Sequence, residues 1–556
     1  MGWLIIGVLL FCIIQAAHAA AGAEDDRPLV DTKYGSLRGR LVTVKKTNRT
    51  VHAFLGVPFA QPPVGPLRFQ KPEPPRPWSS VKDASKHSPI CLQNPKALKG
   101  IKAQFKGNIE IPPVSEDCLY LNVFTLADRE DNSKLPVMVF IHGGGFMMGS
   151  SIQFEASALS AYESVVVVTI QYRLGLLGFF STGDEAARGN YGLLDQVAAL
   201  QWVQENIKDF GGDAQSVTIF GQSAGGVSVS ALVLSPLPKG LFHRAIAESG
   251  VALLPGLFTN KPVDVFIQNA VVNISGCHPD AVVECLKKKT AEEILTISSA
   301  MPIPAFPICV DGVILPKPLE EILAGHGGSP VPFMIGVNEQ EFGWMILRTL
   351  NLTGLADGMD MDTVVATFRR LPLLNFVFNF MSLVMEEYFG DTTDPHEIRD
   401  RFVDLCGDLV FVIPALKTAN YHRDAGHPVF IYEFQHRPSL FHDTKPDFVK
   451  ADHSDELIFV SGAPFSTGEH VYKSEFTEEE EVLSRTMMKY WANFARSGNP
   501  NGPDLVQWPA YDGDEGYLAI SLEQKAATRL KRNRLRFWTE TFPQKVSVEQ
   551  GDHVEL

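Results

Sequence analysis

The chain has 556 residues, 45% of them hydrophobic and 20% charged, so it can bury a large core and does not have the composition of a disordered segment. Its 64 acidic residues outnumber its 49 basic ones, which gives a net charge of −15. A nucleic-acid-binding protein needs a basic surface stripe to displace counterions, and this charge balance argues against that class.

The N-terminal residues have the pattern of a secretory signal peptide. An apolar run over residues 4–14 precedes Ala17-His18-Ala19, a small-x-small cleavage sequence. The run is too short to span a bilayer, which takes about 20 residues. We therefore expect residues 1–19 to be removed and the remaining chain to have no transmembrane span.

Of the seven cysteines, Cys12 lies in the signal peptide, and in the secretory pathway the others are expected to form disulfides. None belongs to a Cys-x-x-Cys pair, so the sequence indicates neither a zinc site nor a thioredoxin-type site. The order along the chain favours pairing of neighbours, which are Cys91 with Cys118 and Cys277 with Cys285. The other two could form a third bridge or remain as buried thiols, and they are Cys309 and Cys406.

Two further signals concern the secretory pathway. N-glycosylation sequons occur at Asn48, Asn273 and Asn351, each with Thr or Ser two positions on and no intervening proline. The last four residues, His553-Val554-Glu555-Leu556, resemble the tetrapeptides by which a receptor returns proteins to the endoplasmic reticulum. We therefore expect a luminal resident of that compartment, with the retrieval receptor as a partner.

Short apolar runs alternate with helical patterns along the chain. Continuous apolar runs predict strands that are buried on both faces, at 136–141, 165–171, 216–220, 332–337 and 429–434. Apolar residues spaced by three and four predict an amphipathic helix through Leu193, Val197, Leu200, Val203 and Ile207. This alternation predicts an α/β fold, with a mostly parallel central sheet flanked by helices, as one enlarged domain over residues 20–552.

Residues 371–385 contain no charged side chain and several aromatic ones, but include Pro372. The segment is too short to cross a membrane. A buried helix that packs on the core is the favoured interpretation. The alternative is a helix that lines the mouth of an apolar substrate gorge.

The sequence Gly221-Gln222-Ser223-Ala224-Gly225 matches the G-x-S-x-G motif of a nucleophile elbow. It follows the strand pattern at 216–220 and precedes a helix start, which is the context that such an elbow requires. Glycines are needed on both sides because side chains there would collide with the strand and the helix. Ser223 is therefore the predicted nucleophile.

A second motif, His142-Gly143-Gly144-Gly145, follows the predicted strand at 136–141. Its glycines leave backbone N–H groups unshielded, as is needed to bind the oxyanion of a tetrahedral intermediate. We predict an oxyanion hole made by the N–H groups of Gly144, Gly145 and Ala224. Another glycine-rich string, at 325–328, follows no buried strand and is predicted to be a loop.

These motifs occur with longer strings at 54–60, 116–123, 190–196 and 210–213. Together they make the chain resemble a type-B carboxylesterase, and in particular the vertebrate carboxylesterases of the endoplasmic reticulum. The resemblance covers essentially the whole mature chain. It implies the α/β-hydrolase fold, a serine esterase with a triad in the order Ser, Glu, His, both short-range disulfides, and no cofactor or metal.

The resemblance implies that Glu341, after the strand at 332–337, is the acid of the triad, and Glu339 remains the near alternative. The base must reach Ser223 from a loop after a late strand. His453 lies about twenty residues beyond the strand at 429–434, in the string that holds the family's catalytic histidine. A carboxylate at the acid position orients the imidazole and stabilises its cation. The competing histidines are His422, His427, His436 and His442.

The sequence departs from the family pattern at two positions. Vertebrate relatives usually carry glutamate before the serine, where this chain has Gln222, and we expect altered tuning of the site rather than lost activity. Leu126 replaces a proline that is common after the string at 116–123, and this change is expected only to soften a turn.

Other proteins of this fold suggest alternative functions. Adhesion relatives lack the triad and carry a transmembrane segment, whereas here the predicted triad and the glycine motif are intact. Cholinesterases hold a tryptophan in the first disulfide loop to bind a quaternary ammonium, and no tryptophan lies between Cys91 and Cys118. A bile-salt-type lipase would be exported, which the terminal tetrapeptide disfavours. The expected substrates are neutral, largely apolar esters of xenobiotic or lipid origin, and self-association is left open.

Overall fold

The computed structural model describes residues 27–96, 110–130, 132–301, 306–349, 354–370, 380–467 and 475–552. The predicted signal peptide, the retrieval tetrapeptide at 553–556, Asn351 and residues 371–379 lie outside the described residues. Within the described ranges, no helix combines the length and the apolar character that crossing a bilayer demands.

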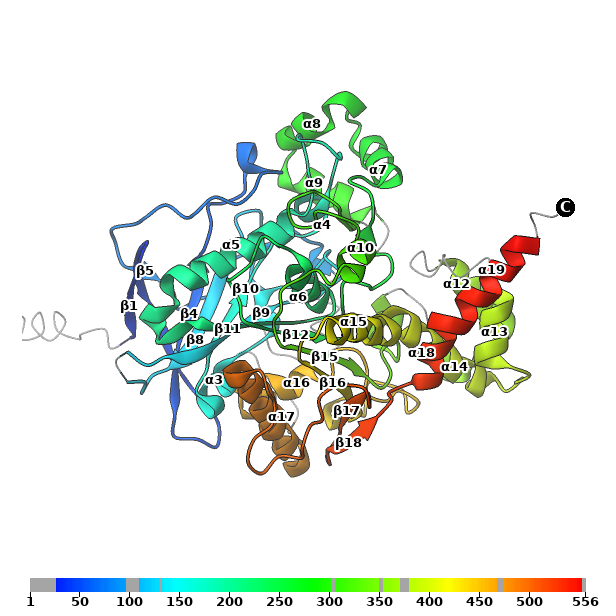
Figure 1. Ribbon diagram of the computed structural model, residues 1–556. Coiled ribbons are helices and arrows are strands. Elements are labelled where there is room, and N and C mark those ends of the chain that lie inside the picture. The colour runs from blue at the N-terminus through cyan, green and yellow to red at the C-terminus, as the bar shows by residue number, and fades with distance from the viewer. Residues whose placement is uncertain are drawn as a thin grey trace, which may run out of the picture.

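An eleven-stranded sheet forms the centre of the molecule, in the order β18-β17-β16-β15-β12-β11-β9-β10-β8-β4-β3 (Figure 1). All neighbours from β17 to β10 pair in parallel, whereas the strands at both ends of the sheet pair antiparallel. The strands are β3 (Arg40–Thr43), β4 (Thr50–Pro58), β8 (Tyr120–Leu126), β9 (Leu135–Ile141), β10 (Val166–Ile170), β11 (Gly212–Gln222), β12 (Arg244–Glu248), β15 (Phe333–Asn338), β16 (Val429–Phe434), β17 (Gly516–Ile520) and β18 (Lys525–Thr528).

Each of the apolar runs singled out in the sequence is a strand of the parallel region, namely β9, β10, β11, β15 and β16. In β10, β15 and β16 every residue is buried. Successive residues of β9 point to opposite faces of the sheet: Val137 and Val139 belong to one apolar cluster, and Met138 and Phe140 belong to the other. The runs are continuously apolar because helices cover both faces.

Helices pack on the two faces of this sheet, as Figure 1 shows. One face carries α5 (Tyr191–Asn206), α6 (Ala224–Leu234) and α15 (Ile413–Asp424). The predicted amphipathic stripe lies in α5 except for Ile207, which begins the 3-10 helix η3 (Ile207–Phe210). The other face carries α3 (Ser157–Glu163), α16 (Leu457–Val460) and α17 (Glu478–Ser497). The chain therefore has the mostly parallel, helix-covered sheet of an α/β-hydrolase.

Further helices lie outside these layers, in two groups (Figure 1). The first comprises α7 (Val265–Ser275), α8 (Val282–Lys288), α9 (Ala291–Ser299) and α10 (Leu319–Ala324). The second comprises α12 (Met361–Arg370), α13 (Met381–Phe389), α14 (Pro395–Gly407), α18 (Arg532–Arg536) and α19 (Phe542–Asp552). The described part of the uncharged segment, residues 380–385, lies at the start of α13, and the loop predicted at 325–328 follows α10.

The structure forms two disulfides, Cys91–Cys118 and Cys277–Cys285, which close loops with sequence separations of 27 and 8. The second of them joins the segment after α7 to α8. Cys309 and Cys406 are buried free thiols, so the third bridge that the sequence allowed does not form.

Candidate active site

A sharp turn at Ser223 joins the end of β11 to the start of α6. Ser223 has φ +57° and ψ −125°, a conformation that costs a non-glycine residue free energy. Two backbone hydrogen bonds hold the turn: the Ser223 N–H donates to the Glu248 carbonyl, and the Val227 N–H donates to the Ser223 carbonyl, both at 2.9 Å. The strained conformation is therefore maintained by hydrogen bonds that join Ser223 to β12 and α6.

Glycines around this turn allow backbone segments to touch. A Cβ atom on Gly225 would lie 2.0 Å from the Ile141 carbonyl oxygen at the end of β9. A Cβ on Gly250, after β12, would lie 2.2 Å from the Ser223 carbonyl oxygen. The sequence motif identified Gly225 but gave no signal for Gly250. Gly250 lies next to Ser223 only because β12 is the neighbour of β11 in the sheet.

The glycine motif after β9 lies against the same turn. A Cβ on Gly143 would lie 3.0 Å from the Cβ of Ser223, and one on Gly144, at φ +112°, would lie 2.1 Å from the Met148 carbonyl oxygen. The His142 ring stacks on Tyr172 with 4.3 Å between ring centroids. Burial lowers the pKa of His142 to about 4, so this histidine is neutral at physiological pH.

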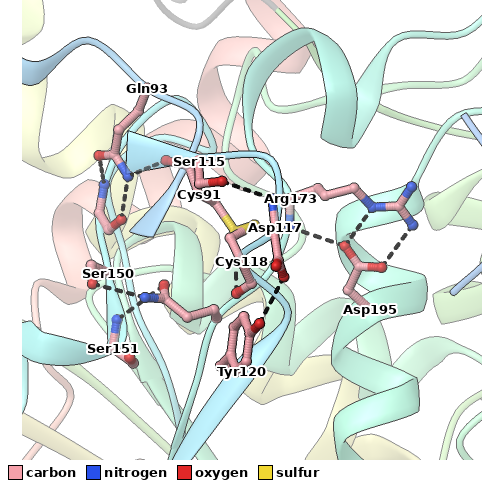
Figure 2. The surroundings of a disulfide bond; sticks show 12 residues. Cys91, Gln93, Ser115, Asp117, Cys118, Tyr120, Ser150, Ser151, Arg173 and Asp195 are labelled. Carbon is pink, nitrogen blue, oxygen red and sulfur yellow. Dashed lines mark hydrogen bonds and ion pairs between the residues drawn. A yellow bond between two sulfur atoms is a disulfide. The ribbon is translucent and has the colours of Figure 1, made fainter. Parts of the chain in front are cut away.

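Gln93, which lies close to the Cys91–Cys118 disulfide in Figure 2, anchors the segment that follows the glycine motif. The Gln93 side chain accepts a hydrogen bond from the Gly149 N–H and donates one to the Gly149 carbonyl, each at 2.8 Å. The same amide donates to the carbonyl of Cys91 at 3.0 Å. Sequence reasoning missed Gln93, because a glutamine beside a cysteine shows no pattern that separates an anchor from a surface residue.

His453 and Glu341 form a buried pair. His453 Nδ1 lies 2.6 Å from Glu341 Oε2, and the other carboxylate oxygen accepts the N–H of Asn338 at 2.7 Å. The two side chains are 2% and 0% exposed. A carboxylate can only accept, so the proton at this contact belongs to Nδ1 of the imidazole.

The other imidazole nitrogen contacts the residue that precedes Ser223. The Gln222 side-chain amide nitrogen lies 3.1 Å from His453 Nε2. An amide nitrogen can only donate, so Nε2 accepts, and both contacts together define a neutral ring that is protonated on Nδ1. Because Gln222 is the last residue of β11, this contact brings the predicted base next to the turn that presents Ser223.

Phe411 packs on the same imidazole, with 4.6 Å between ring centroids. It lies in a π-helical turn, η7 (Asp408–Val412), which joins α14 to α15. Such turns are rare in proteins, but those that occur are often found at functional sites, because the inserted residue redirects its neighbours. The sequence gave no sign of Phe411, since an apolar run of helical composition does not show where a π turn falls.

The loops that carry Glu341 and His453 are joined to each other. The Gln340 N–H donates to the Ala451 carbonyl at 2.9 Å. The Asp452 carboxylate accepts the N–H groups of Trp344 and Met345, each at 3.0 Å, and pairs with Lys445 at 3.2 Å. The two loops therefore hold the imidazole and its carboxylate in one geometry.

The competing residues have other partners. Glu339 pairs with Lys450, with 2.6 Å between Oε1 and Nζ. His436 contacts Glu480, and His422 donates to the Val331 carbonyl beside the ring of His427. His442 lies exposed. The geometry thus favours Glu341 and His453 over every alternative that the sequence left open.

Two further carboxyl groups are buried behind this pair. Glu248 accepts a hydrogen bond from the Trp491 indole at 2.8 Å, and burial raises the pKa of Glu248 to about 8. Burial, together with repulsion from Glu248 and Glu341, raises the pKa of Glu456 well above its usual range. Both groups are therefore neutral acids near neutral pH and add no negative charge behind Glu341.

We expect the buried acid at position 248 to make the stability of the protein depend on pH. Because its pKa is raised in the folded state, the folded chain holds a proton that the unfolded chain has lost between about pH 4.5 and 8. The free energy of unfolding should therefore fall as the pH rises through this window. The Glu248→Gln variant cannot titrate and should lose about 3 kcal/mol less than the wild type between pH 5 and pH 8, as measured by urea unfolding.

The wild type at pH 5 is the matched reference, because Glu248 is then protonated and as neutral as the glutamine of the variant. The neighbouring Tyr432 ring should keep its packing in both proteins. Equal pH slopes for the two proteins would contradict the prediction.

Known proteins resemble this chain over its whole length. The sequence model of the carboxylesterase family matches residues 26–538. The chain is 48% identical over 560 residues to the medium-chain fatty acyl-CoA hydrolase precursor of Anas platyrhynchos, covering 99% of each chain. It is 47% identical over 563 residues to the acylcarnitine hydrolase of Mus musculus, covering 100% of this chain and 99% of the relative. It is 48% identical over 543 residues to the cocaine esterase of Homo sapiens, covering 96% of each. The chain therefore belongs to the carboxylesterase family and is a serine ester hydrolase of the α/β-hydrolase fold.

Proposed function

We propose that the chain hydrolyses neutral, largely apolar carboxylic esters through an acyl-enzyme on Ser223. His453 Nε2 takes the hydroxyl proton as Ser223 Oγ attacks the ester carbonyl carbon. The oxyanion that forms accepts hydrogen bonds from the N–H groups of Gly144, Gly145 and Ala224. The bond to the alcohol then breaks, and His453 gives the proton to the leaving oxygen.

Water completes the cycle. A water molecule attacks the acyl carbon while His453 takes its proton, and the proton returns to Ser223 as the carboxylic acid leaves. Glu341 keeps the imidazole oriented and stabilises the cation that forms in both steps. Each step uses only groups of this chain and water.

One observation carries this proposal: the Glu341–His453 pair, at 2.6 Å, lies beside the strained turn of Ser223 and the glycine motif. Strained backbone next to a buried base and bare peptide N–H groups is typical of nucleophilic acyl transfer, because the strain fixes the attacking oxygen before substrate binds.

The substrate class rests on the relatives and on the sequence. Relatives are named as hydrolases of fatty acyl-CoA, acylcarnitine and pyrethroids and as a cocaine esterase, which indicates a wide range of acyl and alcohol groups. The segment between Cys91 and Cys118 contains no tryptophan for a quaternary ammonium. We therefore place neutral esters first and choline esters last.

We also propose that the mature enzyme comprises residues 20–552 with the terminal tetrapeptide and resides in the lumen of the endoplasmic reticulum. The name of the Anas platyrhynchos relative describes a precursor, which supports a cleaved leader. Asn48 and Asn273 are exposed and open to glycosylation, whereas Asn351 lies outside the described residues. A second copy of the chain is the remaining candidate partner.

Covalent labelling and a substrate panel test the proposal. A fluorophosphonate should inactivate the enzyme with one equivalent incorporated, and peptide mapping should place the adduct on Ser223. The kcat/KM values should then be measured for esters in which acyl and alcohol bulk vary independently, with choline esters included. An adduct on another residue, or a preference for choline esters, would contradict the proposed nucleophile or the proposed substrate class respectively.

A further inference from the structure

Gln222 occupies the lone pair that the proposed base needs. In a neutral imidazole that is protonated on Nδ1, Nε2 has a single acceptor lone pair. Gln222 donates to it at 3.1 Å, and the Ser223 hydroxyl must donate to the same lone pair when it is deprotonated. Among the residues that the structure describes, Gln222 is the side chain that hydrogen-bonds to Nε2.

The position of Gln222 is fixed by its strand. Gln222 ends β11 in register with Glu248 of β12, and the residue is 3% exposed. The peptide carbonyl of Gln222 packs against Gly143, where a Cβ atom would lie 2.6 Å away. The amide is therefore held beside the imidazole by the sheet and by the glycine motif, and it does not reach His453 from a flexible loop.

We propose that Gln222 is a positioning residue that stabilises His453 as the neutral Nδ1–H tautomer and thereby extends ester hydrolysis toward acidic pH. The inference rests on the proposed function. With its amide nitrogen facing Nε2, Gln222 favours the neutral ring, because a protonated Nε2 would face a second donor. The amide thus opposes protonation of the base, and it yields the lone pair to Ser223 during acylation.

The carboxyl groups near the ring have partners other than Nε2, so the residue at position 222 is placed to influence the charge at that nitrogen. Glu341 contacts Nδ1, Glu248 accepts from Trp491, and Glu456 contacts Asn338. Other titratable groups of the described residues also lie near the ring or its neighbours. Asp452 and Asp455 pair with Lys445, and Asp408 pairs with Lys531. His142 is neutral, and Tyr432 lies near the buried carboxyl groups.

Two variants test this role through the pH dependence of acylation. The Gln222→Glu side chain can accept from a protonated Nε2 and adds a negative charge, so it should favour the imidazolium. We expect the midpoint of the acid limb of fluorophosphonate labelling to rise by about one to two pH units. Below the midpoint, each unit lowers the labelling rate about tenfold.

The Gln222→Asn side chain keeps the amide but is one methylene too short to reach Nε2. Loss of a single neutral hydrogen bond should raise the midpoint by up to about one pH unit. The expected order of midpoints is therefore wild type, then Gln222→Asn, then Gln222→Glu. A change that merely loosened the fold would lower the labelling rate at every pH and leave the midpoint in place.

Glu339→Gln is the matched control, because it removes a charge from the Glu341 loop at a residue that pairs with Lys450 and does not contact the ring. Its midpoint should equal that of the wild type. If folded Gln222→Glu labels with the wild-type midpoint, the inference is wrong. If that variant does not fold, the midpoint of Gln222→Asn decides. Failure of wild-type Ser223 to be labelled would instead refute the proposed function, so the two failures are distinguishable.

Discussion

The Ser223→Ala variant should hydrolyse a nitrophenyl ester with a kcat about 10⁶-fold below that of the wild type. Without the hydroxyl there is no oxygen to form the acyl-enzyme, and only the residual rate from substrate binding and the oxyanion hole remains. The fold should be retained, because the hydrogen bonds at the turn involve the N–H and carbonyl of residue 223 and not its side chain. Steady-state kinetics and thermal unfolding of the purified variant measure both effects.

Ser230→Ala provides the matched control. Ser230 is buried in α6, the helix that follows Ser223, and lines a small cavity with His422 and His427, whose lining includes neither Glu341 nor His453. Its removal should leave kcat within about twofold of the wild-type value, as expected for a site outside the chemistry. If the Ser223→Ala variant keeps more than a few per cent of wild-type turnover, another residue is the nucleophile.

The Glu341→Gln variant should lower kcat by about 10⁴-fold with little change in KM. The new amide can still accept the Asn338 N–H, but the nitrogen it presents to His453 would donate to Nδ1. The imidazole proton would then move to Nε2, and a protonated Nε2 cannot accept the proton of Ser223. The loss is one of tautomer rather than of packing, so the free energy of unfolding should change little.

Rate measurements on Glu341→Gln and Glu339→Gln compare two acids on the same loop. Glu339 pairs with Lys450, and its replacement should leave the rate essentially unchanged. Should the larger loss follow Glu339→Gln, the acid of the triad has been assigned to the wrong residue.

The strands of the parallel region could be predicted from local pattern because burial on both faces demands a continuous apolar run. The run at 429–434 coincides with β16, and the run at 136–141 begins one residue inside β9. Ser223 and the glycine motif could be predicted for a similar reason. The turn and the N–H cradle are local structures, and their steric needs leave only glycine at set positions.

The contacts that tune the site could not be predicted in this way. Gln222 meets His453 across 231 residues of chain, and Gln93 meets Gly149 across 56. The polar character of such residues indicates no partner until the strand order places one beside them. Phe411 and Glu248 likewise join the site through packing that leaves no local pattern.

By itself, the sequence determined the fold class, the turn at Ser223 and the family, because each depends on short-range sterics and on the periodicity of burial. The tertiary structure alone decided that Gln222 contacts the second imidazole nitrogen and that Cys309 and Cys406 stay apart. Those outcomes depend on distances between segments far apart in the chain, and only the order and register of the strands set such distances.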